Sequence, residues 1–159
     1  MLNQGTKFGA MLDQLTDRAA LMCLLMVLGQ LYPKYMLLFQ LSCTLDIVAH
    51  WIHIWSSMMK GAESHKSVDL STNPVLRIYY TSRPVLFFMC AGNELFYSML
   101  YLTHFTDGPV LLLGWGLWKV LTILSFPVAV VKSAISAIHL FAACVNVGAI
   151  DAAERQKQQ

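Results

Sequence analysis

Long apolar stretches, each about the length needed to cross a lipid bilayer, alternate along this chain with short polar segments. A bilayer core about 30 Å thick requires about 20 mainly apolar residues in a helix. Four stretches reach that length, at residues 8–31, 35–57, 84–105 and 110–147, and the first is apolar only from Ala19 onward. The pattern predicts an all-α, polytopic membrane bundle of about four transmembrane helices.

The last apolar stretch is too long for one straight crossing, since at about 1.5 Å per residue it would measure nearly twice the membrane thickness. Pro127 is the expected break point. If the stretch divided at Pro127 into two short spans, each span would carry a lysine, Lys119 or Lys132. We favour one span over about residues 123–147, preceded by an interfacial or partly re-entrant helix at 110–122.

The basic residues favour the same arrangement. With four spans, one side of the membrane holds nearly all the loop and terminal cations, and the opposite loops hold only Lys34. An excess of Lys and Arg marks the cytosolic side. We therefore expect both ends of the chain to be cytosolic, together with these residues: Lys7, Lys60, Lys66, Arg77, Arg83, Arg155 and Lys157.

Composition supports a lipid environment and excludes several classes of protein. Hydrophobic residues make up 57% of the chain and charged residues 13%, whereas soluble domains carry roughly 25% charged residues. So few charges cannot cover the surface of a small soluble globule. The net charge is only +2 with no dense basic run, which argues against a nucleic-acid partner. We expect one domain over residues 1–159, with membrane lipid as its surroundings.

Four residues of the first apolar stretch lie on one helix face. At about 100° per residue, Thr6, Gly9, Asp13 and Asp17 fall within an arc of roughly 80°. Two carboxylates at i and i+4 are the hard oxygen ligands that Mg²⁺ or Mn²⁺ prefers. A helix start favoured by the macrodipole and wetted by the membrane interface explains the same residues. The spacing alone leaves both interpretations open.

Polar residues inside the other spans are further candidates. Asp46, His50 and His53 share a face and could form a transition-metal site, although hydrogen bonding between helices is the commoner use of such residues. Arg83 and Lys132 suit recognition of a phosphate or an anionic headgroup. Glu94, in the middle of the third span, requires a cationic partner or a hydrogen bond.

The segment GAMLDQLTD has the spacing Gly9-xxx-Asp13-xxx-Asp17 and resembles the second half of the signature of the CDP-alcohol phosphatidyltransferase family. Three longer segments resemble the eukaryotic, inositol-using members along essentially the whole chain: NQGTKFGAMLD, HKSVDLSTNPVLRIYYTSRPVLF and CAGNELFY. The resemblance implies a six-helix fold of the endoplasmic reticulum membrane with its active face in the cytosol. Two acidic helices of that fold hold two divalent metals, Mg²⁺ or Mn²⁺, under the diphosphate of CDP-diacylglycerol.

The resemblance also implies a reaction and assigns residues to it. A hydroxyl of myo-inositol attacks the phosphorus attached to diacylglycerol, which gives phosphatidylinositol and CMP. By position, Asp13 and Asp17 are metal ligands, and Asp17 is also the general base. Thr6 contacts CDP-diacylglycerol, with Gly9 beside it where the diphosphate comes close. A homodimer is compatible with this assignment.

One part of the family signature is absent. The family has DGxxAR, preceded by a further aspartate, before GxxxDxxxD, whereas this chain starts at Met1 just after that place. We therefore expect an amino-terminally truncated form that lacks the family's first two helices and two of its four metal carboxylates. Its activity alone should be low. The alternative is a catalytically inactive membrane partner or regulator of the complete enzyme.

Overall fold

Helices make up nearly all of the computed structural model, which describes residues 6–62, 82–110 and 114–157. No β-strand occurs in these ranges, so the all-α prediction is confirmed for them. The elements in chain order are α1 (Lys7–Leu31), the short 3-10 helix η1 (Pro33–Tyr35), α2 (Met36–Ala62), α4 (Arg83–Phe105) and α5 (Leu117–Lys157).

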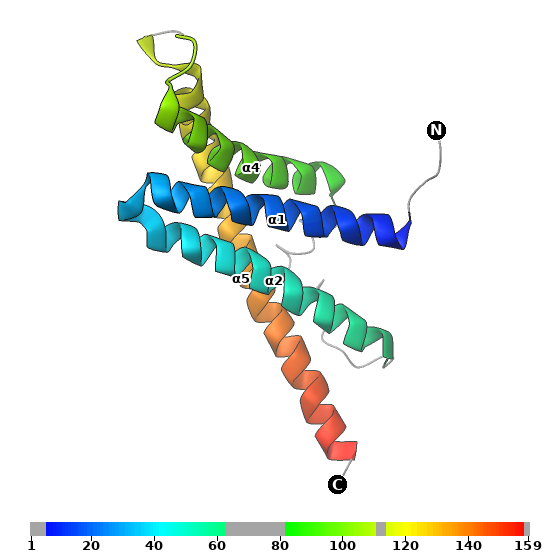
Figure 1. Cartoon of the computed structure of the whole chain (residues 1–159). Helices are drawn as coiled ribbons and strands as arrows, with labels where there is room; N and C mark the ends of the chain where they lie inside the picture. Colours follow the sequence, from blue (N-terminus) through cyan, green and yellow to red (C-terminus); the bar gives the residue numbers. More distant parts are fainter. Residues whose placement is uncertain (1–5, 63–81, 111–113, 158–159) are drawn as a thin grey trace.

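The helices alternate in direction, as a polytopic bundle requires. η1 turns the chain so that α1 and α2 form an antiparallel hairpin, and α4 lies along α1 with its start at the same end (Figure 1). α5 crosses the others obliquely and packs mainly against α4 and α2. An apolar cluster joins α1, α2 and α4 through Leu21, Leu25, Leu28, Phe39 and Tyr97.

Among the described residues, three segments are long and apolar enough to cross a membrane: Pro33–Ser56, which is mostly α2, and the helices α4 and α5. The prediction of a polytopic membrane protein is therefore confirmed. α1 has 25 residues but is not among the three, because its first half carries charged side chains, including Asp13, Asp17 and Arg18.

The expected break at Pro127 is wrong. α5 runs without interruption through 41 residues with Pro127 inside it, and residues 117–122 belong to the same helix rather than to a separate interfacial one. A proline removes one backbone hydrogen bond, but membrane helices tolerate this where packing and nearby hydroxyl groups support the turn. Here packing supplies the support, because α5 contacts α4 and α2 and Ser125 and Ala129 are buried on either side of Pro127.

Close contact between α4 and α5 depends on Gly92. A Cβ atom added there would lie 2.5 Å from Cγ1 of Val128. We expect Gly92→Ala to cost about 1–3 kcal/mol by overpacking and to lower the thermal unfolding temperature in detergent. The matched control is Gly148→Ala, since a Cβ there meets nothing within 4 Å. Rescue by Val128→Ala would confirm the clash, and an unchanged Gly92→Ala variant would contradict it.

Candidate functional site

The start of α1 is built by Thr6 and Gly9. Thr6 is the N-cap, with extended backbone, and its Oγ1 accepts a hydrogen bond of 2.9 Å from the backbone N–H of Gly9. A Cβ on Gly9 would lie only 3.0 Å from that oxygen. The two residues that were predicted to contact substrate therefore also form the cap that fixes where the helix begins.

Asp13 and Asp17 lie one and two turns further along α1, and both are exposed. No hydrogen bond or ion pair joins either carboxylate to another side chain among the described residues. Because they are four residues apart, they lie on one face. We call Asp13 and Asp17 the acidic face. It offers accessible oxygen ligands that form no ion pair with any described cation.

This donor set suits a divalent cation only in part. Among the described residues, no group of three or more His, Cys, Asp or Glu side chains could hold a metal ion. Mg²⁺, however, is commonly bound by one or two carboxylates, with water and substrate phosphates completing its shell. Asp13 and Asp17 fit that mode of binding.

Arg18 follows Asp17 directly but points to the neighbouring helix. One nitrogen of its guanidinium group, Nη1, donates to both carboxylate oxygens of Asp46 on α2, each at 2.7 Å. Both side chains are largely buried. The interpretation of Asp46 as a residue that bonds between helices is confirmed, and its partner, Arg18, is one that the sequence analysis did not identify.

Asp46 also faces α5. Nζ of Lys132 lies 3.9 Å from Oδ1 of Asp46 and donates to Oγ of Ser136 at 3.3 Å. On α2 itself, Nδ1 of His50 lies 2.7 Å from the Asp46 carbonyl oxygen, where its N–H is a donor. We call Arg18, Asp46, His50 and Lys132 the Asp46 cluster, in which cations from two helices approach one carboxylate on a third.

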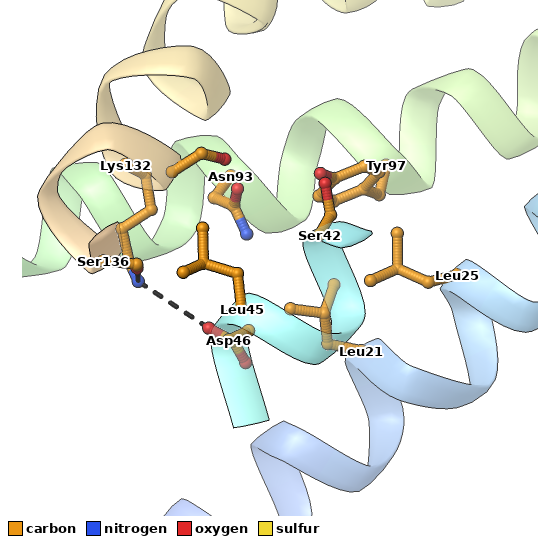
Figure 2. Close-up of a pocket in the computed structure, with 10 residues that line it drawn as sticks. Leu21, Leu25, Ser42, Leu45, Asp46, Asn93, Tyr97, Lys132 and Ser136 are labelled. Atoms are coloured by element: carbon orange, nitrogen blue, oxygen red, sulfur yellow. Dashed lines mark hydrogen bonds and ion pairs between the residues drawn. The ribbon is translucent and has the colours of Figure 1, made fainter. Parts of the chain in front are cut away.

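A small cavity opens beside this cluster. Its volume is about 20 Å³, which is enough for a water molecule but far too little for a sugar alcohol. Figure 2 shows side chains from α1, α2, α4 and α5 around it, with Lys132 and Asp46 on one side. Its polar lining consists of Ser42, Asp46, Asn93, Tyr97, Lys132, Ser133 and Ser136.

The predicted site residues fall in three places. Thr6, Gly9 and the acidic face lie on the first turns of α1, and Arg83 is exposed at the start of α4, at the same end of the bundle (Figure 1). Lys132 alone of these residues lines the cavity, and it is only 5% exposed.

Two other candidates from the sequence have different outcomes. Glu94 is exposed on α4, and no partner for it is seen among the described side chains. The His53 side chain lies outside the described residues, and nothing in the described part supports a transition-metal site at Asp46 and His50. The cavity residues Ser42, Asn93 and Tyr97 carried no sequence signal beyond being polar positions inside apolar helices.

Comparison with known proteins finds close relatives along almost the whole chain. It is 58% identical to the mouse CDP-diacylglycerol–inositol 3-phosphatidyltransferase over 162 residues, which cover 99% of this chain and 74% of the mouse protein. The human protein of the same name is 57% identical over the same shares. The fruit fly protein is 47% identical, covering 99% of this chain and 68% of its own length. No protein-family model and no solved structure matches the chain.

Proposed function

We propose that this chain, which belongs to the family of CDP-diacylglycerol–inositol 3-phosphatidyltransferases, transfers the phosphatidyl group of CDP-diacylglycerol to myo-inositol. The products are phosphatidylinositol and CMP. The observation that carries the proposal is the identity of 58% over 99% of the chain to a protein of that name. The three apolar segments suit an enzyme whose lipid substrate and product both reside in a membrane.

The acidic face is the proposed reaction centre. Asp13 and Asp17 would hold Mg²⁺ or Mn²⁺, and such an ion supplies charge neutralisation at the diphosphate, which makes CMP a better leaving group. Asp17 would also take the proton from the attacking hydroxyl of myo-inositol. Exposure of both carboxylates and the absence of competing partners among the described side chains support these roles.

The first turn of α1 is suited to the phosphates of CDP-diacylglycerol. A helix start presents unpaired N–H groups and a positive dipole to an anion. Thr6 Oγ1 accepts a hydrogen bond from Gly9, which leaves its own hydroxyl hydrogen free to donate to a phosphate oxygen. Gly9 lacks a side chain that would block that approach.

Two cations would complete the recognition of substrate. Arg83, exposed at the start of α4, can bind a phosphate or headgroup at the end of the bundle where α1 begins (Figure 1). Lys132 faces the water-sized cavity from α5 with one described hydrogen bond, to Ser136, so the ammonium retains hydrogens for a water molecule that bridges it to a substrate oxygen. We assign both residues to substrate binding.

The proposed function is tested by incorporation of labelled myo-inositol into lipid with CDP-diacylglycerol and Mn²⁺ present. We expect strong incorporation when the chain carries an added amino-terminal segment with DGxxAR, and little from the 159 residues alone, since two carboxylates hold a pair of metals weakly. An extended chain that makes no phosphatidylinositol would overturn the proposal. Equal rates would show that other groups of this chain complete the site.

We further propose that the enzyme lies in the endoplasmic reticulum membrane with its active end and both termini in the cytosol, an arrangement in which α1 crosses the membrane beside its hairpin partner α2. Glycosylation sites introduced after Gln159 and at Asp107 test this arrangement. Asp107 follows α4, at the end of the bundle opposite the start of α1 (Figure 1). We expect the tag at Asp107 to be modified and the tag after Gln159 to remain unmodified. A glycosylated carboxyl terminus would contradict the arrangement.

A further inference from the structure

Apolar packing holds only the second half of α1. Its buried side chains begin at Leu21 and continue with Leu25 and Leu28, within the cluster shared with α2 and α4. Between residues 6 and 20, no described residue is buried, and Phe8 and Leu15 are 67% and 61% exposed. Packing of described side chains therefore does not hold the turns that carry the acidic face against the rest of the bundle.

One polar contact ties this first half to the rest of the bundle. Of the hydrogen bonds and ion pairs among described residues, only that between Arg18 and Asp46 joins residues 6–20 to another helix. The bond is charge-assisted and short, with the single nitrogen Nη1 at 2.7 Å from both carboxylate oxygens, so it fixes the separation of α1 and α2 at this point. Asp46 belongs to α2, which packs against α5, so the contact ties the first half of α1 to the packed part of the bundle.

We propose that Asp46 is a positioning residue for the acidic face: through Arg18 it holds the first half of α1 against α2, and hence fixes where Asp13 and Asp17 lie. At about 100° per residue, Asp17 lies about 100° and Asp13 about 140° around the helix from Arg18. When Arg18 points to α2, both carboxylates are turned away from the bundle, where substrate can reach them. The catalytic consequence rests on the proposed function, but the positioning itself does not.

Lys132 makes the contact sensitive to the charge of Asp46. Its Nζ lies 3.9 Å from the carboxylate that Arg18 binds, so Asp46 lies between cations from α1 and α5. Without the negative charge, Arg18 and Lys132 would repel each other in surroundings of low dielectric constant. The first half of α1 would then move away from α5, while its second half would stay in the apolar cluster.

Distances between spin labels test the proposal in the full chain, in a background with the native cysteines replaced by alanine. One label replaces Phe87 on α4, and the other replaces either Met11 or Met26 on α1; all three side chains are more than half exposed. We expect Asp46→Asn to broaden or shift the distribution of distances for Met11–Phe87 and to leave that for Met26–Phe87 unchanged. Asp46→Glu should restore the native distribution.

Control variants separate positioning from general damage. Asp151→Asn removes an exposed carboxylate that pairs with Arg155 within α5, and we expect no change in either distance. The double variant Arg18→Leu with Asp46→Leu leaves neither partner of the ion pair behind and should reproduce the broadening even if a single variant fails to fold. Two unchanged distributions in Asp46→Asn, or equal broadening of both, would overturn the proposal.

A second measurement connects positioning to the metal. We expect Asp46→Asn to weaken Mn²⁺ binding about tenfold, as loss of a group that orients metal ligands typically does, in a chain that keeps the native Met26–Phe87 distances. If Asp46→Asn shifts the Met11–Phe87 distance but binds Mn²⁺ as tightly as the native chain, the link between Asp46 and the metal is overturned. If the native chain binds no Mn²⁺, the proposed function loses its metal site, while the label distances still decide whether Asp46 positions α1.

Discussion

Asp17→Asn is expected to abolish inositol transfer at every Mn²⁺ concentration, whereas Asp13→Asn should recover part of its activity as Mn²⁺ is raised. The variants are compared in a chain extended with DGxxAR, so that there is activity to lose. Loss of a metal ligand weakens metal affinity, which mass action can offset, but loss of a base removes a step that metal cannot supply. A proton-transfer residue typically contributes about 10²- to 10⁴-fold in rate.

Both carboxylates are exposed on one face of α1, so their different roles must come from position along the helix. Asp13 lies one turn beyond Gly9, close to the helix start that would receive the diphosphate. Asp17 lies a turn deeper and is followed by Arg18, which is fixed to Asp46 at 2.7 Å. Of the two carboxylates, Asp17 is therefore the better oriented to receive a proton.

Asp151→Asn serves as the control for these variants, because Asp151 is exposed near the end of α5 and pairs only with Arg155 among the described residues. Asp17→Asn should still bind CDP-diacylglycerol, which would show that the variant loses catalysis and not substrate binding. If metal rescues Asp17→Asn and not Asp13→Asn, the two roles are the reverse of those assigned here.

The sequence predicted elements well where local signals decide them. The third span was placed at residues 84–105 from its apolar run and its initial proline, and α4 covers Arg83–Phe105. The same reasoning failed at Pro127, where the rule that proline ends a helix is also local. Contacts of α5 with α4 and α2 stabilise the helix on both sides of Pro127, and the pattern of one segment does not report such contacts.

The candidate site shows the same division. The common face of Asp13 and Asp17 follows from helical periodicity alone. The polar character of Asp46 inside an apolar helix predicted hydrogen bonding between helices. That Arg18 is the partner of Asp46 depends on how the hairpin at η1 aligns α1 with α2, across 28 residues. The burial of Lys132 beside Asp46 depends on how α5 crosses the bundle, for which the sequence carried no signal.

Lys132→Met is expected to lower kcat/KM for transfer about 10²-fold, the effect of removing one donor to a reacting group, without lowering the unfolding temperature. Lys132 is only 5% exposed, and the carboxylate 3.9 Å from it already binds Arg18 at 2.7 Å through both oxygens. Two cations thus face one anion, and the lysine is the less well satisfied of the two. Its removal leaves a balanced pair of charges.

Stability and activity should therefore separate at this position. Removal of one buried charge costs stability where it leaves its partner unpaired, but here Asp46 stays paired with Arg18. A purely structural role for Lys132 would therefore not explain a loss of transfer. The control is Lys119→Met, since Lys119 is exposed on α5 with its ammonium 5.6 Å from the centre of the Trp115 ring. We expect that variant to keep full activity. A charge kept inside a membrane bundle at a cost in stability indicates function, which is why Lys132 is assigned to substrate. A Lys132→Met variant that unfolds at a much lower temperature, or that transfers inositol at the native rate, would contradict this assignment.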